Sequence, residues 1–298
     1  MTRVLLFGAS GFIGRHTRTA LAADTRVAEV ICPGRDAHDL VDGPVSGLAA
    51  LLREAAPDAV VSCVGALTGS TTRLCTANAL VAAKLLDAAE AAAPAARLVR
   101  LGSAGEYGVV PAGESVAEED PARPLSPYGV SHLAGTRLFQ LAGESGRADA
   151  VSLRVFNPIG PGLSGETLLG RAAEAIRGAL GGGAAEITLG PLSAYRDFVD
   201  VRDVAALVKA VVLAPRLRHR VFNAGSGRAV TARQAVGLLA ATAGYHGAIR
   251  EVGAGPSRSS AVDWIRADTG RARAELGWRP AHDLPTSIMD LWRAGTAS

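Results

Sequence analysis

The chain has 298 residues, of which 48% are hydrophobic and 20% charged, with a formal net charge of +3. Such a composition is that of a globular protein large enough to bury a sizeable core. Because the net charge is small and no basic run contains interleaved aromatic residues, a nucleic-acid-binding surface is not expected.

Cysteine usage and the N-terminal sequence bear on location. Cys32, Cys63 and Cys75 lack metal-ligand spacing, so no metal site is predicted, and they indicate buried thiols in a reducing compartment. The first apolar run is too short for a signal peptide and is interrupted by glycines. The alanine-rich segment 79–99 contains four charged residues, which favours a soluble helix over a membrane span. We expect a cytoplasmic protein.

The first half of the chain alternates apolar runs with helical patterns. Strands are predicted at "RVLLFGA", "VAEVIC", "DAVVSCVG", "ARLVRLGS" and "AVSLRVF". Helices are predicted between them at about 12–23, 45–56, 71–93 and 127–142. This alternation is typical of an α/β protein whose doubly wound, Rossmann-type parallel sheet is covered by helices on both faces.

After Phe156 the pattern changes. "NPIGPGLSG" is loop-like, Gly181–Gly183 interrupts a helix–strand transition, and further helices are predicted at about 206–214, 232–244, 269–276 and 285–294. We expect a dinucleotide-binding core of residues 1–156, with a later contribution from about 196–225. A smaller, discontinuous α/β lobe of residues 157–195 and 226–298 would bind substrate, and the ligand cleft would lie between the two.

A glycine-rich turn follows the first strand. Gly8, Gly11 and Gly14 have the spacing that permits a tight turn and a close approach of a pyrophosphate to the N-terminus of the next helix. Because the turn lies between a predicted strand and a predicted helix, it indicates a dinucleotide site rather than an ordinary strand–helix turn. The other residues of the turn expected to contact the cofactor are Ser10, Phe12 and Ile13.

The end of the second strand bears on which dinucleotide binds. An NAD site places an acid there for the adenosine ribose, but the sequence is "ICPGRDA", without an acid at the strand tip. Arg35 would suit the 2′-phosphate of NADP(H), which is therefore the expected cofactor. The alternative is that Arg35 is a solvated loop charge and that Asp36 binds the ribose of NAD(H).

Several segments, in this order, resemble the extended short-chain dehydrogenases/reductases. They are "GASGFIG", "PDAVVSCVGA", Asn78, "LGSAGEYG", "SPYGVSH", "RVFNPIGPG", "YRDFVDVRDVA" and "ELGWRP". The middle of the chain is most similar to GDP-4-keto-6-deoxymannose reductases and other nucleotide-sugar 4-ketoreductases. This resemblance implies an NAD(P)H-dependent oxidoreductase that interconverts a ketone and an alcohol.

The resemblance also implies roles for individual residues. Ser103 would hold the substrate carbonyl and Tyr128 would be the general acid, while Asn157 and Arg196 would contact the substrate and its diphosphate. The cofactor would be contacted by Asp39 and Leu40 on the adenine side, and by Cys63, Val64, Gly65 and Asn78 along the strand edge. A homodimer would form through the helices at Thr71–Ala93 and Pro127–Ala142, as a four-helix interface.

Features absent from the sequence narrow the reaction. The 4,6-dehydratases need an acid just after the catalytic hydroxyl, whereas this chain has Ala104 and Gly105 there, which we place among the substrate-binding residues. Glu106 occupies a position that reductases also fill with Glu, so it is expected to be structural. Epimerising reductases pair a Cys with a His in the substrate lobe, and no His occurs between His132 and His219. Of the reactions of this family, simple reduction of a ketone is therefore the one we expect.

One position departs from the family pattern. Related enzymes carry lysine four residues after the tyrosine, on the same helix face, where it lowers the tyrosine pKa and bonds the nicotinamide ribose. Here that residue is His132. It could bond the ribose and, when protonated, support Tyr128, with help that fades above neutral pH. Alternatively, substrate hydroxyls supply that help and His132 is a spacer, or catalysis is lost. We expect Tyr128→Phe to abolish reduction and His132→Lys to extend activity to higher pH.

The substrate remains open between two classes. Arg196 favours a diphosphate, because guanidinium groups bind phosphate in a bidentate manner; alternatively, it pairs with Asp197 or Asp200. We expect a nucleotide-activated 4-keto-6-deoxysugar. The alternatives are a ketone of a polyketide or other natural product in antibiotic biosynthesis, and a catalytically silent dinucleotide sensor.

Overall fold

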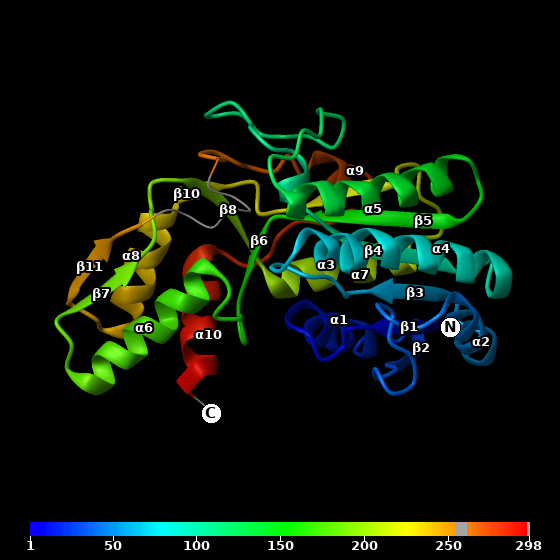
Figure 1. The fold of residues 1–298 in the computed structure, drawn as a ribbon, viewed down its shortest axis with the longest axis horizontal. Coiled ribbons are helices and arrows are strands. Elements are labelled where there is room, and N and C mark those ends of the chain that lie inside the picture. The colour runs from blue at the N-terminus through cyan, green and yellow to red at the C-terminus, as the bar shows by residue number, and fades with distance from the viewer. Residues whose placement is uncertain (254–260, 297–298) are drawn as a thin grey trace.

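The computed structural model describes residues 1–253 and 261–296, so residues 254–260 and 297–298 of the expected substrate lobe lie outside the described residues. A six-stranded parallel sheet in the order β2-β1-β3-β4-β5-β9 forms the larger part of the molecule (Figure 1). Its strands are β1 (Thr2–Phe7), β2 (Val27–Ile31), β3 (Ala59–Ser62), β4 (Arg97–Ser103), β5 (Asp149–Val155) and β9 (Val221–Ala224).

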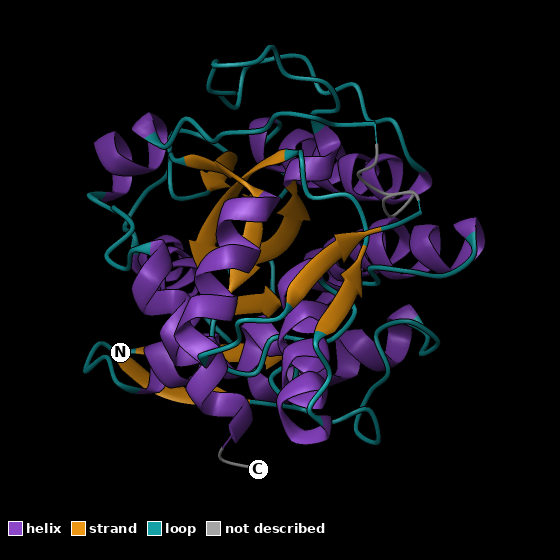
Figure 2. Ribbon diagram, turned by 90° about the vertical axis from the view of Figure 1, so that its left-hand side faces the viewer, coloured by secondary structure: helices purple, strands orange, loops and turns teal. Residues whose placement is uncertain are grey.

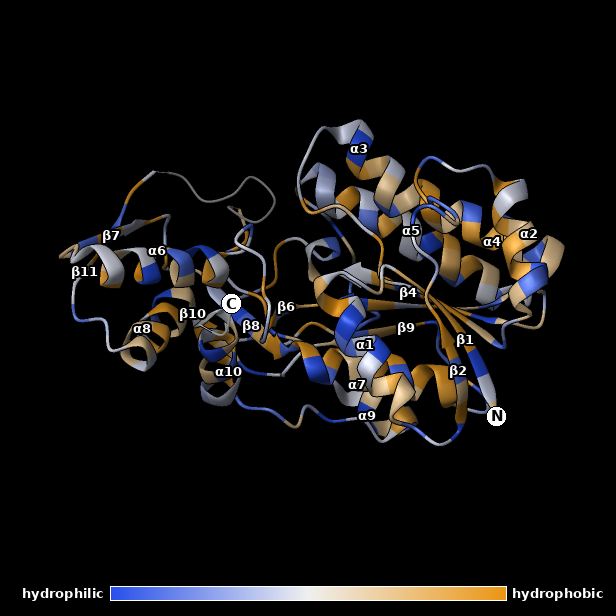
Figure 3. Ribbon diagram, turned by 90° about the horizontal axis from the view of Figure 1, so that it is seen from below, coloured by the Kyte–Doolittle hydropathy of each residue, from blue (hydrophilic) through white to orange (hydrophobic). Residues whose placement is uncertain are grey.

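Both faces of this sheet are buried, which explains why its strands are continuous apolar runs. In β1, Val4 and Leu6 belong to one core and Leu5 and Phe7 to the other, because successive side chains point to opposite faces. The first face is covered by α1 (Phe12–Ala22), α7 (Val201–Leu213) and α9 (Gly270–Leu276). The second is covered by α2 (Val45–Ala55), α4 (Val81–Ala92) and α5 (Pro127–Glu144) (Figure 3).

A smaller body of the molecule has its own core. It contains the sheet β10-β8-β6, the parallel pair β11-β7 and three helices (Figures 1 and 2). The strands are β6 (Asn157–Ile159), β7 (Glu186–Leu189), β8 (Tyr195–Asp200), β10 (Ala229–Thr231) and β11 (Ala248–Glu251). The helices are α6 (Leu168–Gly182), α8 (Ala232–Ala243) and α10 (Leu284–Thr296). Because β6 follows β5 almost directly, the chain passes from the large sheet into this body beside the ends of β4 and β5.

The expected α/β fold with a Rossmann-type parallel sheet is confirmed. Strand order reverses between β1 and β3, so the carboxyl ends of these strands border the crevice where such folds bind ligands. No helix of the described part is long and apolar enough to cross a membrane.

One predicted helix differs from expectation. Instead of one helix over 71–93, the chain forms α3 (Thr71–Cys75), a π-helical turn η1 (Thr76–Leu80) and then α4. Asn78 in this turn pairs through its side chain with the backbone of Ala66: Oδ1 accepts from the Ala66 N–H at 2.8 Å and Nδ2 donates to its carbonyl at 3.1 Å. These tertiary bonds hold Asn78 toward the sheet, and the widened turn accommodates them.

Candidate active site

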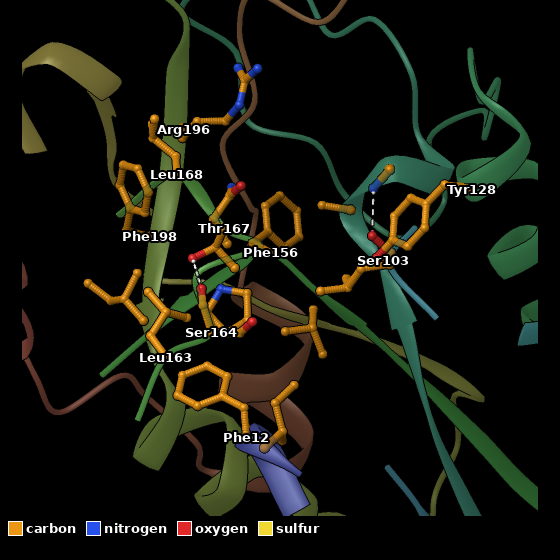
Figure 4. A pocket seen from close by; sticks show the side chains of 18 of the residues that line it. Phe12, Ser103, Tyr128, Phe156, Leu163, Ser164, Thr167, Leu168, Arg196 and Phe198 are labelled. Atoms are coloured by element: carbon orange, nitrogen blue, oxygen red, sulfur yellow. Dashed lines mark hydrogen bonds between the residues drawn. The ribbon is translucent and has the colours of Figure 1, made fainter. Parts of the chain in front are cut away.

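A cavity of about 470 Å³ lies where the carboxyl ends of the large sheet meet the smaller body. Figure 4 shows Ser103 and Tyr128 on one side of it and Leu163, Leu168 and Phe198 on the other. It brings together most of the predicted site residues: Gly11, Phe12, Ile13, Cys63, Val64, Gly65, Ser103, Ala104, Gly105, Tyr128, His132, Asn157 and Arg196.

The glycine turn, which precedes α1, contributes one wall of this cavity. Gly8 has φ +74°, a left-handed conformation that side chains strain to adopt. A Cβ on Gly14 would lie 1.9 Å from the Gly8 carbonyl oxygen, so only glycine lets the helix start this close to the strand. Gly11 is the N-cap of α1, whose first turn contains no acidic residue. The free N–H groups of this helix end therefore fit a pyrophosphate.

The remaining predicted cofactor residues do not line the cavity. Gly8, Ser10 and Gly14 build the turn, and Asn78 is already paired with Ala66 and Ser131, so it positions the cavity wall. Arg35 is exposed, next to the loop that contains Asp39. The Val41 and Asp42 backbone N–H groups and the charge of Arg35 lower the pKa of Asp39, although burial opposes this. Leu40 is buried in the core and anchors the loop.

Ser103 ends β4 with its hydroxyl facing the cavity. Its backbone N–H donates to Oε1 of the buried Glu106 at 2.9 Å, in the capping box of the 3₁₀ turn η2 (Ala104–Glu106), so the structural role expected for Glu106 is present. The Gly105 N–H donates to Ser103 Oγ at 3.1 Å (Figure 4). Because that bond uses an oxygen lone pair, the hydroxyl proton of Ser103 is available for a substrate oxygen.

Two glycines allow the tyrosine helix to approach Ser103. Ser126 caps α5 and Pro127 begins it. A Cβ on Gly129 would lie 2.3 Å from the Gly105 carbonyl oxygen, and one on Gly105 would lie 3.3 Å from Cε1 of Tyr128. The segment "SPYG" therefore presses the Tyr128 ring against the turn that follows Ser103.

His132 stacks beside Tyr128, with ring centroids 4.6 Å apart in an edge-to-face arrangement. It is 7% exposed, and burial, assisted by the charge of Arg100, lowers its pKa to about 3. The imidazole is neutral at physiological pH, so the expectation of a protonated His132 supporting Tyr128 is wrong. The prediction that His132→Lys extends activity to higher pH therefore no longer follows, because His132 carries no charge that a rise in pH would remove.

The neutral imidazole can still bind a ligand. Its Nδ1 is buried and has no hydrogen-bond partner in the part of the chain that the structure describes. A buried polar atom without a partner is costly, which points to a group that completes the site. Together with the glycine turn, this unpartnered atom fits a bound nicotinamide dinucleotide. The contact of His132 with the nicotinamide ribose stays a prediction.

The depressed pKa of His132 predicts a pH dependence of stability. Between its ordinary pKa of about 6.5 and its folded value, only the unfolded chain binds the proton, so the free energy of unfolding falls as the pH falls through this window. We expect His132→Gln to reduce this loss, by up to about 1.4 kcal/mol per pH unit. Urea unfolding at several pH values between 4 and 7 measures it. Equal pH slopes in both proteins would contradict a neutral His132.

Sequence reasoning missed the far wall of the cavity. It comes from the loop before α6 and the start of that helix, from β8 and from the segment before α9, with the apolar side chains of Leu163, Leu168, Phe198, Val262 and Ile265. Arg171 of α6 also lines it. No local pattern in these segments predicts that their side chains meet in one cavity; the tertiary fold brings them together. The one usable signal was "NPIGPGLSG", whose loop chemistry marks the start of this wall.

Arg196 was alternatively expected to pair with Asp197 or Asp200. The carboxylates of both residues are held by other groups. Asp197 accepts bonds from Ser226, Gly227 and Ala267, and Asp200 pairs with Arg202 at 2.7 Å. Arg196 donates to the Tyr195 carbonyl at 2.8 Å, and its pKa is lowered by burial and raised by Asp263. Arg196 and Arg171 are both among the residues that line the cavity.

Comparison with known proteins agrees with this geometry. A model of the NAD dependent epimerase/dehydratase family matches residues 4–225. The chain is 38% identical to dTDP-6-deoxy-L-talose 4-dehydrogenase (NAD(P)(+)) of Kitasatospora kifunensis, over 98% of this chain and 95% of the relative. It is 28% identical to GDP-6-deoxy-D-mannose reductase of Pseudomonas aeruginosa, over 96% of this chain and 94% of the relative.

Solved structures extend the comparison. The structure of RMD from Pseudomonas aeruginosa complexed with NADPH matches with a TM-score of 0.86 and 27% identity, over 100% of this chain and 99% of that one. A Thermus thermophilus UDP-glucose 4-epimerase complex with NAD matches with a TM-score of 0.83 and 26% identity, over 99% of both chains.

The fold and the Ser–Tyr site define an oxidoreductase of the extended short-chain dehydrogenase/reductase class. The chain belongs to the NAD dependent epimerase/dehydratase family. The resemblance stated from its motifs is thereby confirmed, as is its expected nature as an enzyme.

Proposed function

We propose that this protein is an NADPH-dependent ketoreductase that reduces the 4-keto group of a nucleotide-activated 6-deoxysugar. The observation that carries the proposal is the juxtaposition of the Ser103 hydroxyl and the Tyr128 ring at one wall of a cavity that Arg171 and Arg196 also line. The two relatives named above act, by their names, on 6-deoxysugars joined to dTDP or GDP. The higher identity to the first makes a dTDP-4-keto-6-deoxyhexose the first substrate to test.

The residues of the site support reduction rather than elimination. When bound, the reduced nicotinamide supplies a hydride to the ketone carbon, so negative charge develops on the carbonyl oxygen. Ser103 donates a hydrogen bond to that oxygen, and Tyr128 donates a hydrogen bond and then its proton. The product is the alcohol, and the phenolate left on Tyr128 regains a proton from water. Ala104 and Gly105 provide no acid for dehydration.

NADP(H) is the cofactor that the site favours. Gly8, Gly11 and Gly14 would hold the pyrophosphate and His132 the nicotinamide ribose. Arg35, exposed beside the adenine-side loop, would hold the 2′-phosphate. The protein from Pseudomonas aeruginosa that matches with a TM-score of 0.86 was solved with NADPH.

The two arginines support a diphosphate-bearing substrate. We expect Arg196→Leu to raise the KM for the sugar nucleotide about tenfold to 100-fold, because a charged hydrogen bond contributes about 1.5–3 kcal/mol. The Kd for NADPH should stay unchanged, since Arg196 belongs to the smaller body. Arg250→Leu, which removes an exposed arginine paired with Glu186, is the matched control. An unaltered KM for Arg196→Leu would exclude this contact.

Consumption of NADPH or NADH with a panel of ketones tests the function. The panel contains dTDP- and GDP-linked 4-keto-6-deoxysugars and polyketide-type ketones. Turnover of a sugar nucleotide with preference for NADPH is expected. Turnover of the polyketide-type ketones alone would assign the enzyme to natural-product reduction, and tight NADPH binding without any turnover would make it a sensor. Either result overturns the proposal.

We also propose that different parts of the chain bind the cofactor and the substrate. Residues 1–156, with about 196–225, would bind the dinucleotide, and residues 157–195 and 226–298 would bind the substrate. The large sheet with its glycine turn and the separate core of the smaller body support this division. Two elements depart from it: β8, with Arg196, lies in the sheet of the smaller body, and α9 packs on the large sheet.

A homodimer would form through α3, α4 and α5. Exposed apolar side chains on η1 and α5 support this interface: Leu80, Val130, Leu138 and Leu141. We expect Leu138→Arg to convert the dimer to a monomer in sedimentation analysis, because a charge would be buried in an apolar contact. Leu180→Arg, at an exposed leucine on α6, should leave the dimer intact. A dimer that survives Leu138→Arg would place the interface elsewhere.

A further inference from the structure

Arg100 on β4 lies directly beneath the helix that carries Tyr128 and His132. It is 4% exposed and is not among the residues that line the cavity. Its guanidinium donates to four oxygens: Thr136 Oγ1 at 2.8 Å, Ser152 Oγ at 3.0 Å, the Asn78 carbonyl at 3.1 Å and the His132 carbonyl at 3.4 Å. These acceptors are neutral, so the site holds the cation without cancelling its charge.

The helix is built to accommodate this group. A Cβ at Gly135 would lie 2.8 Å from Nη2 and 2.9 Å from Cζ of Arg100. The same Cβ would lie 2.5 Å from the Asn78 carbonyl oxygen, so any larger residue at position 135 would displace the helix, the Asn78 backbone or the guanidinium. The second glycine of "SPYGVSHLAG" therefore makes room for a buried cation next to the Tyr–His pair.

The charges around this point do not balance. Glu106 pairs with Arg154 at 2.8 Å, both side chains being fully or almost fully buried. Thr136 connects the pair to Arg100, accepting from its guanidinium and donating to Glu106 at 2.9 Å. Arg100 itself makes no salt bridge within the described ranges. One carboxylate thus faces two guanidinium groups, and the surplus positive charge lies under α5.

Arg100 and Tyr128 interact electrostatically. Burial lowers the pKa of Arg100 to about 10, while the negative charges of Glu106 and ionised Tyr128 act to raise it. The guanidinium is therefore protonated at neutral pH. The coupling is reciprocal: if ionised Tyr128 favours the cation, the cation favours ionised Tyr128.

We propose that Arg100 is the fixed cation that makes the Tyr128 proton available, the electrostatic task that lysine performs in related enzymes and that His132 does not perform. The inference rests on the proposed reduction, in which Tyr128 loses its proton to the substrate oxygen and Arg100 stabilises the phenolate left behind. Arg100 acts through Tyr128 and is a positioning residue. The other titratable or charged groups of this cluster are His132, Glu106 and Arg154.

Titration of Tyr128 itself tests the proposal. The chain contains four tyrosines, so NMR of protein labelled with ¹³C at the tyrosine Cζ gives few signals, and Tyr128→Phe assigns the one of interest. We expect Arg100→Gln to raise the Tyr128 pKa by about one unit or more, and Arg100→Lys to restore most of the difference. The matched control is Arg97→Gln, which removes a buried arginine three residues earlier on the same strand. It should leave that pKa unchanged.

The outcomes are distinct. An unchanged Tyr128 pKa in folded Arg100→Gln would overturn the proposal, even if that variant were less stable. Should Arg100→Gln not fold, Arg100→Met, which removes the charge but keeps a long side chain, should raise the same pKa, and an unchanged value there would be equally decisive. The titration uses the protein without cofactor or substrate, so failure of the proposed ketone reduction would not alter its reading.

Discussion

Tyr128→Phe is expected to lower kcat for ketone reduction by about 10²–10⁴-fold, the usual contribution of a positioned general acid. Phenylalanine fills the same space against Gly105 and His132, so the variant loses a proton donor and no packing. The Kd for NADPH and the unfolding free energy should therefore stay close to those of the wild type. Single-turnover kinetics together with cofactor titration measure both quantities.

Ser103→Ala provides the comparison for this result. It removes a hydrogen-bond donor to the developing oxyanion but leaves the proton source, so it should reduce the rate while leaving the pH dependence governed by Tyr128. Reduction at the wild-type rate by Tyr128→Phe would show that another group supplies the proton, and the proposed mechanism would fail.

Gly14→Ala is expected to abolish dinucleotide binding and to destabilise the fold. The new Cβ would lie 1.9 Å from the Gly8 carbonyl oxygen and 3.0 Å from the Cα of Ala9, atoms of the backbone that cannot rotate away. Either α1 retreats from β1 or the turn opens, and both changes disperse the N–H groups aimed at the pyrophosphate. We expect a loss of about 1–3 kcal/mol of stability, as for other overpacked sites.

Gly237→Ala is the matched control for this substitution. Gly237 lies within α8, and an added Cβ there meets no atom within 4 Å. Alanine should therefore stabilise this helix by about 0.5–1 kcal/mol and leave NADPH binding unchanged. Thermal unfolding and fluorescence titration of both variants give the comparison. Normal NADPH affinity in Gly14→Ala would contradict the assignment of the turn to the pyrophosphate.

The local sequence was enough to predict those parts of the fold that depend on hydrophobic pattern and residue spacing within one segment. The strands of the large sheet are continuous apolar runs because both of their faces are buried, and the glycine turn is identifiable because strand, spacing and helix occur together. Ser103 and Tyr128 could be named because each lies in a segment, "LGSAGEYG" or "SPYGVSH", that resembles a motif of the family. Their proximity follows from β4 and α5 packing through Gly105 and Gly129.

The remaining features depend on contacts between distant segments. The π turn at Thr76–Leu80 exists because Asn78 bonds to a loop 12 residues earlier. The neutral state of His132 depends on its burial and on Arg100, 32 residues away on another element. Arg100 itself occurs in a strand pattern with nothing to distinguish it from a solvated charge. The apolar wall at Leu163 and Phe198 forms only when the smaller body folds back over the sheet.

The most direct test of the proposed function is isotope transfer from NADPH labelled with deuterium at C4 of the nicotinamide to a dTDP-4-keto-6-deoxyhexose. One deuterium at C4 of the sugar, incorporated at least about 100-fold more slowly by Tyr128→Phe, is the predicted result. Deuterium at another carbon, or none at all while NADPH is bound tightly, would contradict the placement of the carbonyl between Ser103 and Tyr128.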